Sequence, residues 1–257
     1  MRIVHISDIH CTYGTDFNER VFEKAVKYVN SLDADFVFVS GDLTTDGLLS
    51  EYELAQKKTK EISSKLFVVP GNHDERNLGF KLFPEFFGDT DFIHSLKNLT
   101  LIGLASSEPD KDDGRLGRGR YRKIADCIVP HKLTIVGFHH HLVPVPGSGR
   151  ETNIIEDAGE TLDLILRKEV PLVLMGHRHV PWAVKIHKTL LVNAGTFSCN
   201  RTRAHYGHTF NVIDIEDKII MVSIVDIRNE QTRKMVELNL NDGCCINQYY
   251  DSQAAPQ

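Results

Sequence analysis

The sequence predicts a single α/β domain whose second half is antiparallel. Three observations favour this fold class: strand-like and helix-like segments alternate through two thirds of the chain, the strands there are short and almost wholly apolar, and consecutive strands follow the last helix. Apolar strands separated by helices are typical of a buried parallel sheet, whereas consecutive strands favour hairpins.

The predicted elements follow from the spacing of apolar residues. Residues 17–32 carry apolar side chains at helical spacing, and Asp16 is placed to cap that helix. The other elements predicted in the alternating part are strands at 3–7, 35–40, 65–69, 99–106, 133–138 and 171–175 and helices at 49–63, 79–88, 120–128 and 157–168. The strands predicted after Trp182 are 183–186, 190–193, 209–215, 218–227 and 233–238, with a hairpin turn at Glu216–Asp217.

Composition is that of an ordinary globular protein. The chain has 257 residues, of which 41% are hydrophobic and 25% charged, and its net charge is −5. We expect residues 1–240 to form one domain and the polar residues 241–257 to form a loose tail. The negative net charge argues against binding to a nucleic-acid polymer but leaves a nucleotide substrate open, because a metal centre supplies positive charge locally.

The sequence also predicts a cytoplasmic location without membrane association. No apolar run reaches the ~20 residues that span a bilayer, and the first residues have the pattern of a strand and not of a signal peptide. The five cysteines lack the C-x-x-C spacing of a zinc site or redox pair, so we expect reduced thiols.

Five short polar motifs each follow a predicted strand. They are Asp8-Ile9-His10, Gly41-Asp42, Gly71-Asn72-His73-Asp74, the first of the histidines at 139–141, and Gly176-His177-Arg178-His179. Ligands of open α/β sheets bind beyond the carboxyl ends of the strands, so these residues would meet at one edge. Carboxylate oxygen, amide oxygen and imidazole nitrogen are ligands of hard to borderline metals. Each motif alone would be an ordinary turn, but the ordered set favours a metal site.

The order D-x-H, G-D, G-N-H-D, H and G-H-x-H resembles the signature of the calcineurin-like metallophosphoesterases over residues 8–179. The resemblance implies a sandwich of two β-sheets flanked by helices, and a centre of two divalent ions, for which manganese, iron, zinc and cobalt are all compatible. It implies one metal held by Asp8, His10 and His179, a second held by Asn72, His139 and His177, and a bridge formed by Asp42. A bridging carboxylate offsets the repulsion of two cations ~3.5–4 Å apart.

Two assignments leave alternatives open. His73 would lie beside the metals as an acid or as a phosphate contact, oriented by Asp74. His139 is the usual ligand of the family, but His140 and His141 follow it directly and would otherwise line the pocket.

The loop at 199–208 also has two interpretations. It contains Arg201, Arg203, His205 and His208, and it would either face the metals and contact substrate or be a solvated connection.

Within the family, the chain resembles most the class III cyclic-nucleotide phosphodiesterases. That resemblance rests on HHHLVPVPGSG, a following helix and PLVLMGHRH, whereas the charged segment 108–123 departs from it. We therefore expect a phosphodiesterase that hydrolyses cyclic nucleotides or similar small phosphodiesters with hydroxide activated by the metals. The alternatives are a phosphatase or nucleotide pyrophosphohydrolase acting on another small phosphate ester, and a non-enzymatic scaffold, which the complete ligand set argues against. A homodimer is left open.

Overall fold

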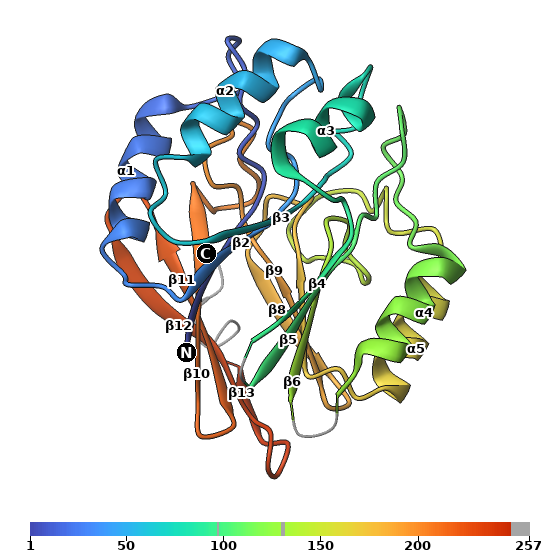
Figure 1. The fold of residues 1–257 in the computed structure, drawn as a ribbon. Coiled ribbons are helices and arrows are strands. Elements are labelled where there is room, and N and C mark those ends of the chain that lie inside the picture. The colour runs from blue at the N-terminus through green and yellow to red at the C-terminus, as the bar shows by residue number, and fades with distance from the viewer. Residues whose placement is uncertain (97, 130–131, 248–257) are drawn as a thin grey trace.

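The computed structural model describes residues 1–96, 98–129 and 132–247. Two β-sheets pack face to face with helices on both outer faces, which confirms the predicted fold class (Figure 1). The helices are α1 (Glu19–Asn30), α2 (Leu49–Thr59), α3 (Gly79–Phe87), α4 (Gly117–Cys127) and α5 (Ala158–Arg167). None of the helices in these residues is long and apolar enough to cross a membrane.

The first sheet joins the beginning of the chain to its end, in the order β13-β12-β11-β10-β1-β2-β3. Its strands are β1 (Arg2–Ile6), β2 (Phe36–Ser40), β3 (Leu66–Val69), β10 (Thr209–Glu216), β11 (Ile219–Asp226), β12 (Gln231–Asn239) and β13 (Cys245–Asn247). Strands β1 to β3 are parallel, and β10 to β13 are antiparallel hairpins. The predicted hairpin between β10 and β11 is confirmed, but Asp217 and Lys218, both with positive φ, form its turn.

The second sheet has the order β4-β5-β6-β7-β9-β8. Its strands are β4 (Phe92–Ser95), β5 (Leu99–Gly103), β6 (Leu133–Gly137), β7 (Leu172–Met175), β8 (Trp182–Ile186) and β9 (Thr189–Asn193). The four inner strands are parallel, and the edge strands β4 and β8 are antiparallel to their neighbours. The carboxyl ends of the parallel strands therefore share one edge of each sheet.

Three apolar layers stabilise the sandwich, because successive side chains of a strand point to opposite faces. In β2, Phe36 and Phe38 pack between the two sheets, whereas Val37 and Val39 pack with buried residues of α1 and α2. The second sheet repeats this division, with Val136 of β6 packed against the layer of α4 and α5. The strands are apolar on both faces for this reason, as the sequence indicated.

Three local predictions differ from the structure. Asn18, and not Asp16, caps α1, since its side chain accepts a hydrogen bond from the N–H of Val21 at 3.1 Å. The edge strand β4 was not predicted, because only alternate residues of it are sheltered from solvent. Residues 245–247, predicted to belong to a loose tail, form β13 through backbone pairing with β12, and the rest of that tail, 248–257, lies outside the described residues.

The two sheets approach closely at Gly137 of β6. A Cβ atom on Gly137 would lie 2.2 Å from a ring carbon of Phe38 in the facing sheet. We expect Gly137→Ala to lower the free energy of unfolding by about 1–3 kcal/mol, because overpacking displaces the ring or the strands. Urea denaturation measures this change. The control is Gly119→Ala in α4, where a Cβ contacts nothing and alanine favours the helix; equal stability of Gly137→Ala and wild type would contradict the close contact.

Candidate metal centre

The structure brings the seven residues predicted to bind metal to one edge of the sandwich, just beyond the carboxyl ends of β1, β2, β3, β6 and β7. Ligand atoms lie within 4.8 Å of one another in three groups: Asp8, His10 and His179; His10, Asp42 and His73; and Asp42, His139 and His177. The amide oxygen of Asn72 completes the third group, since it lies 3.1 Å from both His139 Nε2 and His177 Nδ1. Residues from all five motifs therefore converge, as expected from the shared edge of the strand ends.

Asp42 connects the groups. Its Oδ1 accepts a hydrogen bond from the backbone N–H of His73 at 3.0 Å, and its Oδ2 lies 3.5 Å from His10 Nε2 and 3.3 Å from His139 Nε2. Gly71 makes this placement possible, because a Cβ there would lie 2.1 Å from Asp42 Oδ1. Oδ1 is thus held by the backbone, and Oδ2 faces His10 of the first group and His139 of the third.

The first group contains buried polar atoms that make no hydrogen bond. Asp8 Oδ1 lies 3.1 Å from His179 Nε2 and 3.9 Å from His10 Nε2. In the described part of the chain, Asp8 Oδ1 and His10 Nε2 are buried and make no hydrogen bond. Burial of a polar atom without a partner costs about 1–3 kcal/mol. A cation bound between them would satisfy both atoms, so the donor set fits a metal ion.

Backbone carbonyl groups orient two of the imidazole rings. His139 Nδ1 donates to the carbonyl of Ser40 at 2.6 Å, and His179 Nδ1 donates to the carbonyl of Arg201 at 2.6 Å. A proton fixed on Nδ1 leaves a lone pair on Nε2, which is the form of histidine that binds metal. Burial by itself disfavours a charged ring, but Asp42 outweighs it and raises the pKa of His139 to about 9, so protons and a metal compete for Nε2.

The neighbours of His139 are engaged elsewhere. His140 contacts the hydroxyl of Ser106 through Nδ1 at 2.8 Å and the carbonyl of Asp112 through Nε2 at 3.1 Å. His141 Nε2 lies 2.6 Å from a carboxylate oxygen of Glu151. These contacts favour His139 among the three candidates.

The backbone at this edge is strained. Positive φ values between 54° and 71° occur at Asp8, His10, Asp42, His177 and His179. Such values are uncommon outside glycine and cluster at functional sites, where the surroundings enforce them. Sequence patterns do not reveal this strain, which turns the side chains after the strands toward one another.

His73 lies beside the residues that would hold metal. Its Nδ1 donates to the carbonyl of Thr45 at 2.5 Å, and its ring is edge-on to that of His10, with the ring centres 4.6 Å apart. We expected Asp74 to orient this ring, and that expectation is wrong, because the carbonyl of Thr45 has that role.

Asp74 instead connects the loop after β2 to the loop after β3 through hydrogen bonds. Its carboxylate accepts hydrogen bonds from the N–H and hydroxyl of Thr44, at 2.9 and 3.0 Å, and from the N–H of Gly71 at 2.9 Å. Burial and the nearby charge of Asp42 raise the pKa of Asp74 to about 7. The loops after β2 and β3, which carry Asp42 and Asn72, are therefore fixed relative to each other.

Two further residues border the centre. Arg201 Nη2 lies 3.1 Å from His10 Nδ1, so the loop at 199–208 faces the site at this residue. Asp112 accepts a hydrogen bond from Asn72 Nδ2 at 3.1 Å, which places the charged segment after β5 against the group of Asn72, His139 and His177. Asp112 could not be singled out from the sequence, because it is one of several acidic residues in a charged loop.

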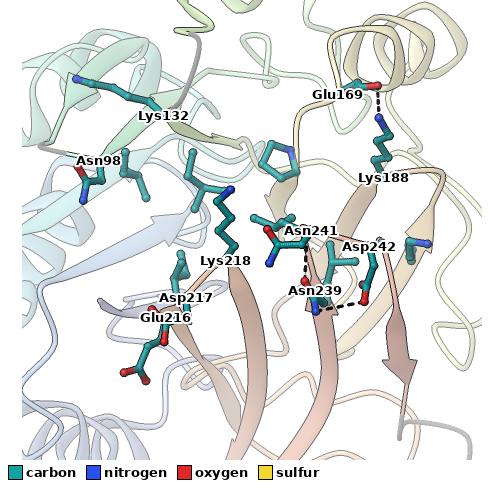
Figure 2. Close-up of a pocket in the computed structure, with 18 of the residues that line it drawn as sticks. Asn98, Lys132, Glu169, Lys188, Glu216, Asp217, Lys218, Asn239, Asn241 and Asp242 are labelled. Carbon is teal, nitrogen blue, oxygen red and sulfur yellow. Dashed lines mark hydrogen bonds and ion pairs between the residues drawn. The ribbon is translucent and has the colours of Figure 1, made fainter.

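A hollow of about 1150 Å³ lies at the opposite end of the sheets (Figure 2). It is lined by residues at the starts of β5 and β6 and at the ends of β10 and β12, and Lys188 forms an ion pair with Glu169 on its wall at 2.6 Å. None of the predicted site residues lines it. The hollow is thus separate from the metal centre.

Comparisons with known proteins agree with this geometry. Residues 1–181 match the calcineurin-like phosphoesterase family model. The chain therefore belongs to the calcineurin-like phosphoesterase family, and it is a metal-dependent hydrolase of phosphoric esters.

Individual relatives are distant. A probable cyclic nucleotide phosphodiesterase of Ruthia magnifica subsp. Calyptogena magnifica is 25% identical over 184 residues, which cover 68% of this chain and 77% of the relative. A probable glycerophosphodiester phosphodiesterase, GpdQ, of Arcobacter nitrofigilis is 25% identical over 217 residues, or 76% and 78% of the two chains. A dimetal phosphatase from Danio rerio has the same fold, with a TM-score of 0.72 at 10% identity over 91% of this chain and 98% of the other.

The histidine run offers a direct test of the ligand set. We expect His139→Ala to lose about one metal ion per chain, since Nε2 of His139 faces Asp42 and Asn72, and two-metal sites need both ligand groups. His141→Ala is the matched control, because it removes an equally buried imidazole that binds Glu151. Metal analysis of the purified, folded variants decides the matter, and full metal content in His139→Ala with loss in His141→Ala would reverse the assignment.

Proposed function

We propose that the chain hydrolyses small phosphodiesters at a centre of two divalent metal ions, with cyclic nucleotides as the leading substrate class. The observation that carries the proposal is the position of Asp42 Oδ2 between His10 and His139, which belong to different ligand groups. A carboxylate oxygen that faces both groups is the feature that a two-metal centre requires and a single metal site does not.

The ligand sets of the proposal follow the groups of the structure. The first ion would be held by Asp8, His10 and His179, the second by Asn72, His139 and His177, and both by Asp42. Two divalent ions bound there neutralise charge on the phosphate and lower the pKa of water so that hydroxide is available near neutral pH. Manganese, iron, zinc and cobalt all suit these ligands.

The charge of the site favours a diester over a monoester. A diester carries one negative charge and a monoester nearly two, so sites for monoesters usually add cationic donors. Arg178, although it belongs to a metal motif, binds Ser148 and backbone carbonyls and is not available to a phosphate. Arg201 is the guanidinium that borders the centre, beside His10. The diesterase names of the two relatives above support the same substrate class.

A substrate panel tests the proposed class. Metal-stripped protein reloaded with each candidate metal should hydrolyse bis(4-nitrophenyl) phosphate with a kcat/KM at least tenfold above that for 4-nitrophenyl phosphate, a difference of ~1.4 kcal/mol in the barrier. Cyclic nucleotides and a glycerophosphodiester, assayed in parallel, distinguish the two diester classes. A preference for the monoester of that size would instead establish the alternative, a phosphatase acting on small phosphate esters.

His73 is the side chain that we propose as proton donor to the leaving group. An alkoxide leaves poorly without a proton, and histidine has a pKa close to the operating pH. The Thr45 carbonyl fixes a proton on Nδ1, so Nε2 is the atom that exchanges a proton with substrate. The hydrogen bond from the His73 backbone to Asp42 keeps the residue next to the proposed ligands, where a substrate phosphate would bind.

Leaving groups of different basicity test this role. His73→Ala should slow hydrolysis of a cyclic nucleotide by ~10²–10⁴-fold, the range typical of general acid catalysis. It should affect a nitrophenyl diester far less, because nitrophenolate leaves without a proton.

Metal analysis of His73→Ala is part of that experiment, since His73 also lies within ligand distance of His10 and Asp42. The exposed His187, remote from the centre, provides the control variant His187→Ala. Equal losses on both substrates at unchanged metal content would leave His73 as a phosphate contact, and loss of metal would make it a ligand.

A further inference from the structure

Arg178 is buried at the edge of the metal centre, and its guanidinium is used entirely by a neighbouring loop. The residue is 2% exposed. Its Nε and Nη2 donate to the hydroxyl of Ser148 at 3.1 and 3.0 Å, and Nη2 also reaches the carbonyls of Ser148 at 3.2 Å and Arg150 at 2.9 Å. Nη1 donates to the carbonyl of Thr152 at 3.2 Å. One side chain thus binds three residues of the segment 145–152.

The segment 145–152 has few other contacts that would fix it. Its sequence is VPGSGRET, and Gly147 and Gly149 both have positive φ. Most of its residues are exposed, although Val145 and Ser148 are buried. Its internal hydrogen bonds run from the N–H and hydroxyl of Ser148 to the carbonyl of Val145, at 3.3 and 2.7 Å. Val145 packs in the core between the sheets, but the mostly exposed, glycine-containing residues after it need a further anchor to keep one conformation.

The same segment touches the metal centre on one side. Glu151 binds His141 Nε2 at 2.6 Å, and the ring of His141 stacks on that of His177 with the ring centres 5.6 Å apart. The segment therefore borders the group of Asn72, His139 and His177.

On its other side the segment meets the loop at 199–208, which borders the group of Asp8, His10 and His179. The carbonyl of Ser148, which Arg178 contacts, also accepts a hydrogen bond from Arg203 Nη1 at 3.0 Å. Two residues earlier, the carbonyl of Arg201 accepts a hydrogen bond from Nδ1 of His179. Segments 145–152 and 201–204 thus form one continuous rim, which we call the Ser148 wall, between His141 and His179.

We propose that Arg178 is a positioning residue that holds the Ser148 wall in place, and that this wall selects substrates by the group beyond the phosphate. The second part rests on the proposed function. An ester group attached to a phosphate at the metals projects past the ligands to the rim. A wall that is already ordered binds that group without a further cost in conformational entropy. A mobile wall would have to become ordered on binding, and that cost would lower its affinity for the substrate.

The first experiment needs no activity. Arg178→Met keeps the length and apolar stem of the side chain but removes its hydrogen bonds. Limited trypsin digestion of the folded protein should cut after Arg150 at least about tenfold faster in the variant, because cleavage follows local opening. Mass spectrometry identifies the site. The matched control is Lys58→Met, which removes another buried cation at the end of α2, where Lys58 pairs with Glu19 and Glu61, and it should leave this cleavage unchanged.

The second experiment separates the wall from the metals. Methyl 4-nitrophenyl phosphate and thymidine 5′-(4-nitrophenyl) phosphate share a leaving group and differ only in the group beyond the phosphate. Arg178→Met should raise KM for the thymidine ester about tenfold with kcat nearly unchanged, the pattern of lost uniform binding, and should alter KM for the methyl ester less than about twofold. Metal content should remain that of wild type.

A milder variant guards against a folding failure. Ser148→Ala keeps Arg178 and removes the hydroxyl that accepts two of its hydrogen bonds. It should raise the rate of cleavage after Arg150 and KM for the thymidine ester, each by less than Arg178→Met does.

Each outcome decides a part of the proposal. Unchanged cleavage after Arg150 in folded Arg178→Met overturns the positioning role. Faster cleavage with equal KM changes for both esters overturns selection by the wall, and loss of metal shows that Arg178 acts through His177 and His179 instead. If wild type hydrolyses neither ester, the proposed function and the selection both fail, while the cleavage rate still decides the positioning role.

Discussion

The Asp42 carboxylate is held by the backbone on one side and faces two histidines on the other. Its Oδ1 is fixed by the N–H of His73, and Gly71 passes so close that no side chain fits there. The rest of the centre depends on this constraint, because Oδ2 can face both ligand groups only if the loops after β2 and β3 stay together. Asp74, buried beneath them, maintains that spacing. Asp8 Oδ1 and His10 Nε2 are therefore buried without a hydrogen bond, at an edge where the backbone is strained. A bound cation would offset the free-energy cost of this arrangement.

The sequence predicted that the proposed ligands would converge, for a simple geometric reason. Each of them follows a short apolar strand, and parallel strands end at a common edge, so periodicity and order were enough to bring Asp8 and His177 together. The sequence did not reveal which groups support them. Asp74 and Arg178 bind backbone groups and a hydroxyl of other loops, and neither the residue type nor the spacing records such contacts. The strands β4 and β13 were missed for a related reason, since pairing with a neighbouring edge stabilises them and they bury little apolar surface.

The residues that would hold metal and the loops proposed to select substrates belong to different parts of the architecture. The residues that would hold metal lie directly beyond the strands, where the two sheets and the three apolar layers fix the backbone. The rim around them comes from the loops after β5, β6 and β9, which carry Asp112, Ser148 and Arg201. A change in those loops alters the shape offered to a substrate without moving the strand ends. The hollow at the other end of the sheets has no part in this arrangement.

The pairing of β1 has a consequence for how the chain is made. β1 lies between β2 and β10, and Arg2 at its start faces Asp214, with which it forms an ion pair at 2.8 Å. During synthesis β1 and β2 can associate early, but the other edge of β1 has no partner until β10 has left the ribosome. An unpaired apolar strand edge is prone to aggregation, and contacts between distant parts of a chain form slowly. The strand that leads to Asp8 and His10 therefore gains one neighbour early in synthesis and the other only late, and between these two events one of its edges is open to aggregation.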